Sequence, residues 1–174
     1  MAILIDSYSE SNYDSGYGYP CGQSFTGNGS ILDSAKVLTF REGSPSGNCY
    51  IKIYAHSGTF GTSSVPTGSA LATSDVRDAS TLTSYGLSTF TFSGVERIKL
   101  VNNTHYVMVF DYSGADLSIG GDWTSPTHDG NYCRYYNGSW TAYSGYDLCF
   151  YIYGEEMPPI IGEKYPLPPF RRSV

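Results

Sequence analysis

The sequence predicts an all-β domain built from two antiparallel sheets. Tyr and Gly are abundant, with 17 and 20 residues among 174, whereas Lys and Arg together number only 10. The apolar residues fall in short runs rich in β-branched and aromatic side chains, and turn-forming residues separate these runs. No stretch shows the periodicity of a long amphipathic helix. A chain of this length fits one domain with a sizeable core.

The first half of the chain predicts strands at residues 2–7, 22–26 and 31–40, followed by one at 49–55. The last of these alternates cleanly, which places Ile51 and Ile53 on a buried face and Tyr50, Lys52 and Tyr54 on the other. Residues 56–69 are rich in Gly, Ser, Thr and Pro and predict a long loop at one end of the domain. Residues 71–74 predict a brief strand, and 75–82 at most one helical turn.

In the second half, residues 89–92 alternate again, and residues 105–112 form the strongest strand signal in the chain. The latter is apolar on both faces and is therefore expected to be central. Further strands are expected at 117–120, 133–136, 139–143 and 148–153. About ten short strands separated by turns fit a sandwich of jelly-roll type, with an eight-stranded closed barrel as the alternative.

Asn137-Gly138 is a strong hairpin signal, because both residues suit the positive φ angles of a type I′ turn. This turn would pair Tyr136 with Ser139 and Tyr135 with Trp140. Tyr135 and Trp140 would then share one sheet face and could present a flat aromatic surface. Such a surface suits stacking on a sugar ring or on a partner's side chain, but aromatic cross-strand pairs also simply stabilise sheets.

Composition changes after Gly154, so the sequence divides into a domain at 1–154 and a Pro-rich C-terminal arm at 155–174. The arm has too many prolines for a central strand and too many apolar residues for a solvated tail. We expect an extended segment that lies on another surface, or else a terminus packed on its own domain. Its expected anchors are Ile160, Ile161, Tyr165, Leu167 and Phe170.

Charge and terminal sequence bear on partners and on location. The net charge of −6 and a pI near 4.8 disfavour binding to nucleic acid. Residues 1–6 lack a basic start, and Asp6 interrupts the apolar run, so no signal peptide is expected. No stretch is long and apolar enough to cross a bilayer. The chain is therefore expected to be made in the cytoplasm and to have no membrane partner.

The four cysteines show no zinc-ribbon spacing, and buried or half-buried thiols are favoured over disulfides. Cys49 is expected to face the core with Ile51, whereas Cys149 is expected on the more exposed face of its strand. These opposite settings disfavour a bridge between them. If a bridge forms, the expected pair is Cys21, in the loop after the first strand, with Cys133, at the mouth of the Asn137-Gly138 hairpin, because loop cysteines adjust their geometry more easily.

The sequence offers no catalytic constellation, and we expect no enzyme, metal ion or cofactor. The histidines, His56, His105 and His128, stand in unrelated contexts. Gly120-Gly121 is expected in a turn. Carboxylates that meet only in the fold stay possible as a glycosidase pair. Asp111, Asp116, Asp122 and Asp129 could line one end of the sandwich, but their spacing matches no compact calcium loop.

Trp123 follows a glycine pair and precedes a Pro turn, so it is expected in a loop. An exposed Trp beside His128 and polar neighbours would resemble a sugar-binding ledge, in which hydrogen-bonding groups edge a stacking plane. The alternative is a loop anchor tucked under the edge of the sandwich. The candidate residues for binding a glycan or partner are Trp123, His128, Tyr135, Trp140 and Tyr143.

Six segments in order resemble a recurrent jelly-roll module of tailed-phage and metagenomic virion proteins, related in layout to carbohydrate-binding modules. They are GQSFT at 22–26, IYAH at 53–56, GSALATSD at 68–75, FTFSG at 90–94, SPTHDGN at 125–131 and YNGSW at 136–140. The resemblance covers residues 1–154 and implies a non-enzymatic structural or adhesive part of a virion.

The expected function is therefore a phage virion surface protein, either a capsid decoration protein or a head or tail fibre component, attached partly through the arm. Its expected partners are capsid or tail proteins and possibly a host-surface glycan, within a homo-oligomer or larger assembly. The alternative function is a carbohydrate-binding module that recognises a glycan through exposed aromatic side chains.

Overall fold

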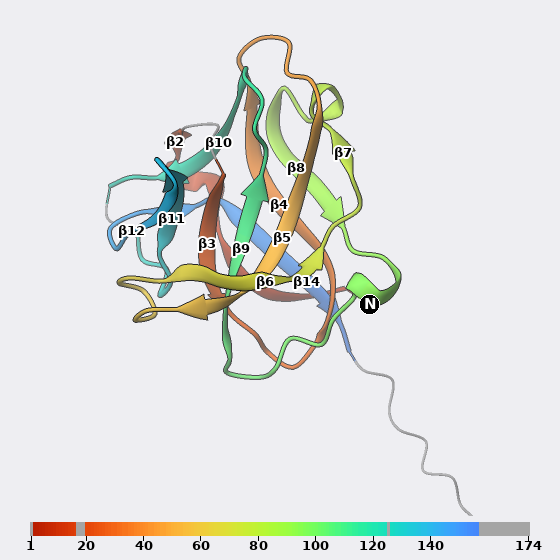
Figure 1. The fold of residues 1–174 in the computed structure, drawn as a ribbon, viewed down its shortest axis with the longest axis vertical. Coiled ribbons are helices and arrows are strands. Elements are labelled where there is room, and N and C mark those ends of the chain that lie inside the picture. The colour runs from red at the N-terminus through yellow and green to blue at the C-terminus, as the bar shows by residue number, and fades with distance from the viewer. Residues whose placement is uncertain (1, 17–19, 125, 157–174) are drawn as a thin grey trace, which may run out of the picture.

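The computed structural model describes residues 2–16, 20–124 and 126–156, and it confirms an all-β sandwich of two antiparallel sheets (Figure 1). Sheet 1 has the order β1 (Ala2–Tyr8), β14 (Phe150–Glu155), β4 (Ile31–Arg41), β10 (Leu117–Asp122) and β13 (Asp147–Leu148), with β2 (Asp14–Ser15) beside β10 and β8 (Tyr85–Thr91) beside β4. Sheet 2 has the order β12 (Ser139–Tyr143), β11 (Tyr132–Tyr136), β3 (Cys21–Thr26), β9 (His105–Asp111), β5 (Asn48–Ser57) and β6 (Val65–Thr73), with β7 (Arg77–Asp78) beside β5.

Helical structure among the described residues is limited to three short 3₁₀ turns. They are η1 (Glu10–Asn12), η2 (Ala79–Thr81) and η3 (Gly94–Glu96). No helix in the described ranges has the length and apolar character needed to cross a membrane.

The main core lies between the two sheets. Phe25, Phe90, Phe110 and Phe150 are fully buried there, together with the inward-facing aliphatic residues of both sheets. As predicted, Ile51 and the neighbouring Ile53 are buried, and the alternate residues of β5 are not. β9 is central as predicted, since it pairs with β3 on one side and β5 on the other.

Sheet 2 also carries a small second core on its outer face. Val107, Val109 and Cys133 are buried there, and Tyr54, Val65 and Trp140 pack against them. Because alternate residues of a strand point to opposite faces, β9 supplies Met108 and Phe110 to the main core and its two valines to the small one. Two-sided burial explains why this strand is apolar on both faces.

Residues 56–69 were expected to form a long loop, and this expectation is wrong for the second half of the range. Residues 65–73 form β6, which pairs with β5 with a register shift between Ile53 and Ala55. β6 contains Pro66 and Gly68, residues that usually weaken strands. Its place at the end of the order of sheet 2 tolerates both, because one side of an edge strand needs no ladder partner.

The hairpin signal at Asn137-Gly138 is confirmed. Both residues have positive φ, 50° and 83°, and Tyr136 pairs with Ser139 and Tyr135 with Trp140. At the other end of the chain, β14 continues through Glu155, one residue into the segment assigned to the arm. The arm anchors Ile160, Ile161, Tyr165, Leu167 and Phe170 lie outside the described residues.

All four cysteines are buried thiols, and none forms a disulfide. The expected loop position of Cys21 is wrong, because it lies in β3, whereas Cys133 lies in β11, where a strand was expected. Cys21 belongs to the main core and Cys133 to the small one, so their side chains point to opposite faces of sheet 2 and cannot be bridged. The exposed setting expected for Cys149 is also wrong. It precedes β14, and its N–H bonds the carbonyl of Gly120 at 3.0 Å.

We expect the folded protein to resist thiol alkylation at pH 8. Burial raises the pKa of Cys21 to about 12 and that of Cys49 to about 11, so neither thiolate is populated. Mass spectrometry after iodoacetamide treatment should find no adduct on the native protein and four on the denatured, unreduced protein. A Cys21–Cys133 peptide in the unreduced digest would contradict the assignment of these side chains to opposite faces.

Candidate functional site

A cleft of about 790 Å³ lies where the β11–β12 hairpin approaches β2 and β10. Four aromatic residues, Trp123, Tyr132, Tyr143 and Tyr146, form one side of it, and we call them the aromatic cluster. The full lining consists of Ser15, Gly16, Glu42, Gly114, Ala115, Asp116, Leu117, Ser118, Trp123, Tyr132, Arg134, Tyr143 and Tyr146.

The rings of the aromatic cluster contact one another from the core outward. Trp123 meets Tyr132 and Tyr146 edge to face, with centroids 5.2 Å and 5.5 Å away. Tyr143 stacks on Tyr146 at 5.6 Å, with 12° between the ring planes. Tyr132 is buried, Trp123 and Tyr143 are half-buried, and Tyr146 is 37% exposed. Three rings of the cluster are therefore accessible to a ligand.

The register of the hairpin decides which side chains reach the cleft. Tyr132 pairs with Tyr143, and Arg134 lies two residues along β11 on the same face. Tyr135 and Trp140 pair on the opposite face, next to the small second core. One hairpin thus supplies aromatic side chains to both faces, and only one of these faces borders the cleft.

Trp123 is held by backbone that approaches its ring closely. A Cβ on Gly16 would stand 2.6 Å from its Cζ2 atom, and a Cβ on Gly121 would stand 2.5 Å from its Cη2 atom. The turn expected at Gly120-Gly121 is wrong, because both residues lie in β10. Their lack of side chains serves packing instead, since Leu38 fills the corresponding space beside Gly120.

Polar groups also line the cleft. The guanidinium of Arg134 lies 5.8 Å from the centroid of Tyr143 and donates to its hydroxyl at 3.3 Å. Ser118 Oγ donates to Glu42 Oε1 at 2.5 Å. Asp116 Oδ2 accepts from the Ser44 N–H at 3.3 Å. The cleft therefore combines π faces with a guanidinium, hydroxyls and carboxylates, which can donate and accept hydrogen bonds.

The sequence-derived candidates fall in three places. Trp123 and Tyr143 line the cleft. Tyr135 and Trp140 lie on the outer face of sheet 2 with their ring planes inclined at 58°, so they do not form the expected flat surface. His128 is only 9% exposed at its side chain and belongs to a buried charged network.

Sequence reasoning missed Tyr132, Tyr146, Arg134 and Glu42, whereas Asp116 was considered only as one of four possible clustered carboxylates. Counting pairs back from Asn137-Gly138 would have found Tyr132 opposite Tyr143, with Arg134 on the same face. Glu42 follows β4 and carries no local signal, because only the fold brings the end of that strand to the hairpin.

His128 connects elements from both sheets. Its Nε2 lies 3.1 Å from Asp6 Oδ1 of β1, and its Nδ1 lies 3.6 Å from Asp147 Oδ1 of β13. Gln23 of β3 donates to the same Asp147 oxygen. The Gly130 N–H also points at Nδ1 at 3.0 Å, so a proton on Nδ1 gains the ion pair at the expense of this backbone bond. We call Asp6, Gln23, His128 and Asp147 the charged network.

The charges of the network shift one another's protonation. Burial lowers the pKa of His128, but hydrogen bonds and charges from Asp147 and Asp6 outweigh it and raise the pKa to about 9. Burial raises the pKa of Asp147 despite the nearby imidazole. Burial also acts to raise the pKa of Asp6, but its bonds from His128 and Thr26 lower it overall. The imidazole is therefore charged at neutral pH, between the buried Asp147 and the half-buried Asp6.

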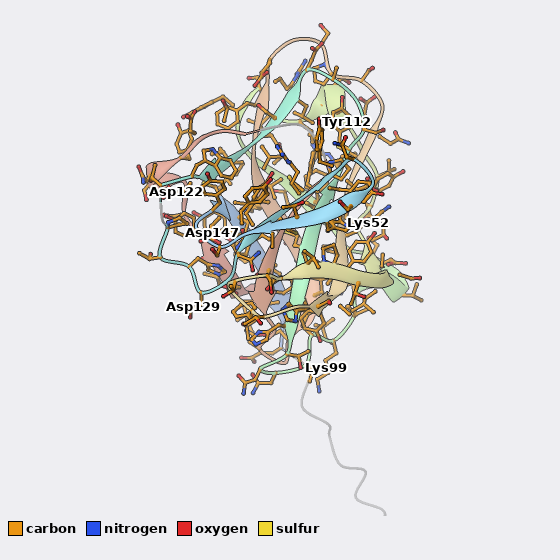
Figure 2. All side chains as sticks on the ribbon, turned by 60° about the vertical axis from the view of Figure 1, so that its left-hand side comes forward. Lys52, Lys99, Tyr112, Asp122, Asp129 and Asp147 are labelled. Carbon is orange, nitrogen blue, oxygen red and sulfur yellow. The ribbon has the colours of Figure 1, made fainter. Side chains whose placement is uncertain are left out.

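The four aspartates considered as a possible carboxylate site do not gather at one place. Figure 2 shows Asp122 and Asp129 on one side of the molecule and Lys52, which pairs with Asp111 at 2.5 Å, on the other. Asp122 is buried and accepts from Tyr8 at 2.7 Å and from Asn12 at 3.0 Å. Burial acts to raise its pKa, but these bonds and those from Thr124 lower it to about 2.

Comparisons with protein-family models, with curated proteins and with solved structures found no match to this chain. The chemistry of the cleft is therefore the basis for its assignment.

We expect the stability of the protein to fall between pH 6.5 and pH 9. His128 has its pKa raised from 6.5 to about 9 on folding, so its contribution is complete below pH 6.5 and is lost as the pH rises through 9. Urea unfolding should show the free energy of unfolding decreasing by roughly 2 kcal/mol over this window. The variant His128→Gln should flatten the profile. A native protein with a flat profile would argue against a charged His128.

Proposed function

We propose that this chain is a non-enzymatic binding protein that takes a carbohydrate in the aromatic cleft. The observation that carries the proposal is the aromatic cluster, which has three accessible rings and shares one cleft with polar groups. Aromatic faces stack on the C–H face of a sugar ring, and flanking donors and acceptors then bind its hydroxyls. The cleft volume of about 790 Å³ is in the range of small-molecule sites.

The carboxylates of the cleft are better suited to binding than to catalysis. Glu42 already accepts a hydrogen bond from Ser118, and Asp116 holds the N–H of Ser44. Each can still accept from a ligand hydroxyl through a remaining lone pair. Arg134 contributes hydrogen-bond donors beside Tyr143, so neutral sugars with several hydroxyls suit this combination of groups.

A virion surface is the setting that we propose for this module, and jelly-roll type is the topology that we propose for the sandwich. The support for both is the resemblance of the six ordered segments.

The end of the sandwich where β14 finishes adds one observation in favour of attachment there. Glu155, the last residue of β14, forms an ion pair with Arg97 at 2.5 Å. Val95 lies two residues before Arg97 in the chain, and it is 90% exposed. Leu4, opposite Tyr153 of β14, is 48% exposed. Exposed apolar side chains suit contact with capsid or tail proteins.

Replacing Tyr146 with Ala should weaken glycan binding roughly tenfold or more, because a stacked aromatic contributes on the order of 1–3 kcal/mol. The measurement is a glycan array that spans bacterial surface polysaccharides and neutral plant polysaccharides, followed by calorimetry with the strongest hit. The variant Trp123→Ala should also lose binding, but its ring packs on the main core, so its folding must be checked separately.

Tyr135→Ala is the matched control, since Tyr135 is 40% exposed but lies outside the cleft. It should bind as the native protein does. An array without hits, or equal losses for Tyr135→Ala and Tyr146→Ala, would refute the assignment of the cleft.

Removing residues 157–174 should leave a folded domain that no longer joins particles. The cut keeps Glu155, because this residue pairs with Ala2 and Ile31 and bonds Arg97. Circular dichroism and thermal melting would establish folding, and sedimentation with virions or capsids would measure attachment. Full occupancy by the truncated protein would rule out the arm as the attachment device.

A further inference from the structure

Two of the three histidines lie together on the outer face of sheet 2. Ala55 of β5 pairs with Tyr106 of β9, and one further step brings His56 opposite His105. The centroids of the two imidazole rings are 5.6 Å apart. The two strands run side by side in Figure 1. The expectation of unrelated contexts is wrong for this pair, because the sheet joins strands that are distant in the sequence.

Each ring uses one nitrogen in a hydrogen bond to a hydroxyl group. His56 Nε2 lies 3.1 Å from Ser64 Oγ, whose own proton goes to the carbonyl of Thr59, so His56 Nε2–H is the donor. His105 Nδ1 lies 3.1 Å from Thr26 Oγ1. Within the described part of the chain, His56 Nδ1 and His105 Nε2 have no hydrogen-bond partner. The tautomers with the proton on His56 Nε2 and on His105 Nδ1 leave one lone pair available on each ring.

The separation of the rings suits a shared metal ion. With a metal–nitrogen bond of about 2.0–2.1 Å, an imidazole centroid lies about 3.2 Å from the ion. With His56 Nδ1 and His105 Nε2 turned toward one ion, two such centroids 5.6 Å apart would give a nitrogen–metal–nitrogen angle of about 120°. Phe60 stacks on His105 at 3.8 Å with 9° between the planes, which restrains this ring without covering its edge.

We propose that His56 and His105 together bind one divalent transition-metal ion of the class that prefers imidazole, such as Zn²⁺ or Ni²⁺. No third His, Cys, Asp or Glu joins them among residues 2–16, 20–124 and 126–156, so water fills the other positions. Metal-bound histidines usually donate their second nitrogen to an acceptor that fixes the tautomer. Ser64 has that role for His56, and Thr26 stands in the same relation to His105.

The test is a titration of the full chain with ZnCl₂ at pH 7, followed by ¹⁵N-edited NMR of the imidazole rings. The ring signals of His56 and His105 should change together and saturate at one equivalent. His128 is the internal control, and its signals should stay unchanged because both of its nitrogens are engaged in the charged network. EDTA should restore the original spectrum.

Two variants separate a shared site from binding to one ring. His56→Asn and His105→Asn should each weaken Zn²⁺ binding at least roughly tenfold by calorimetry, and both rings are only half-buried, so the fold should persist. The proposal is overturned if either variant keeps the native affinity, if all three histidines respond alike, or if no ring signal changes. The readout does not depend on carbohydrate, so its result is independent of the function proposed for the cleft.

Discussion

Two-sided burial of sheet 2 is the constraint on which most of the structure depends. Its central strands pack against sheet 1 on one face and against the small second core on the other, so each residue has one permitted direction. The same alternation separates Cys21 from Cys133 and directs Tyr143 into the cleft but Trp140 away from it. It also places His56 and His105 on one face. A slip of one residue in these strands would disrupt both cores.

The sequence was informative where a pattern is local. The alternation of β5, the apolar β9 and the Asn137-Gly138 turn each contain their own evidence, and all three are confirmed. It misled where tertiary pairing outweighed composition. β6 is a strand despite Pro66 because an edge position tolerates it, and Gly120-Gly121 is extended because Leu38 and Trp123 fill the space beside it.

For the candidate site, the sequence did not reveal which of the candidate side chains are exposed in the fold. Of the five candidates, Trp123 and Tyr143 reach the cleft, and both come from segments whose aromatic content marked them. His128 was chosen as a polar neighbour of Trp123, but it pairs with the half-buried Asp6 of β1 and the buried Asp147 of β13. Asp6 is more than a hundred residues away from His128 in the sequence, and Asp147 lies on another strand, so no local motif identifies these partners.

The charged network also helps to hold the rings of the cleft in place. Trp123 directly follows β10, and His128 is tied to Asp6 and to Asp147, the neighbour of Tyr146 in the chain. Asp122, just before Trp123, is buried and pairs across the ladder with Asp147. Two accessible rings of the cleft are thus attached to backbone that buried polar contacts fix in place. A ligand then meets rings that are already positioned, which reduces the entropy lost on binding.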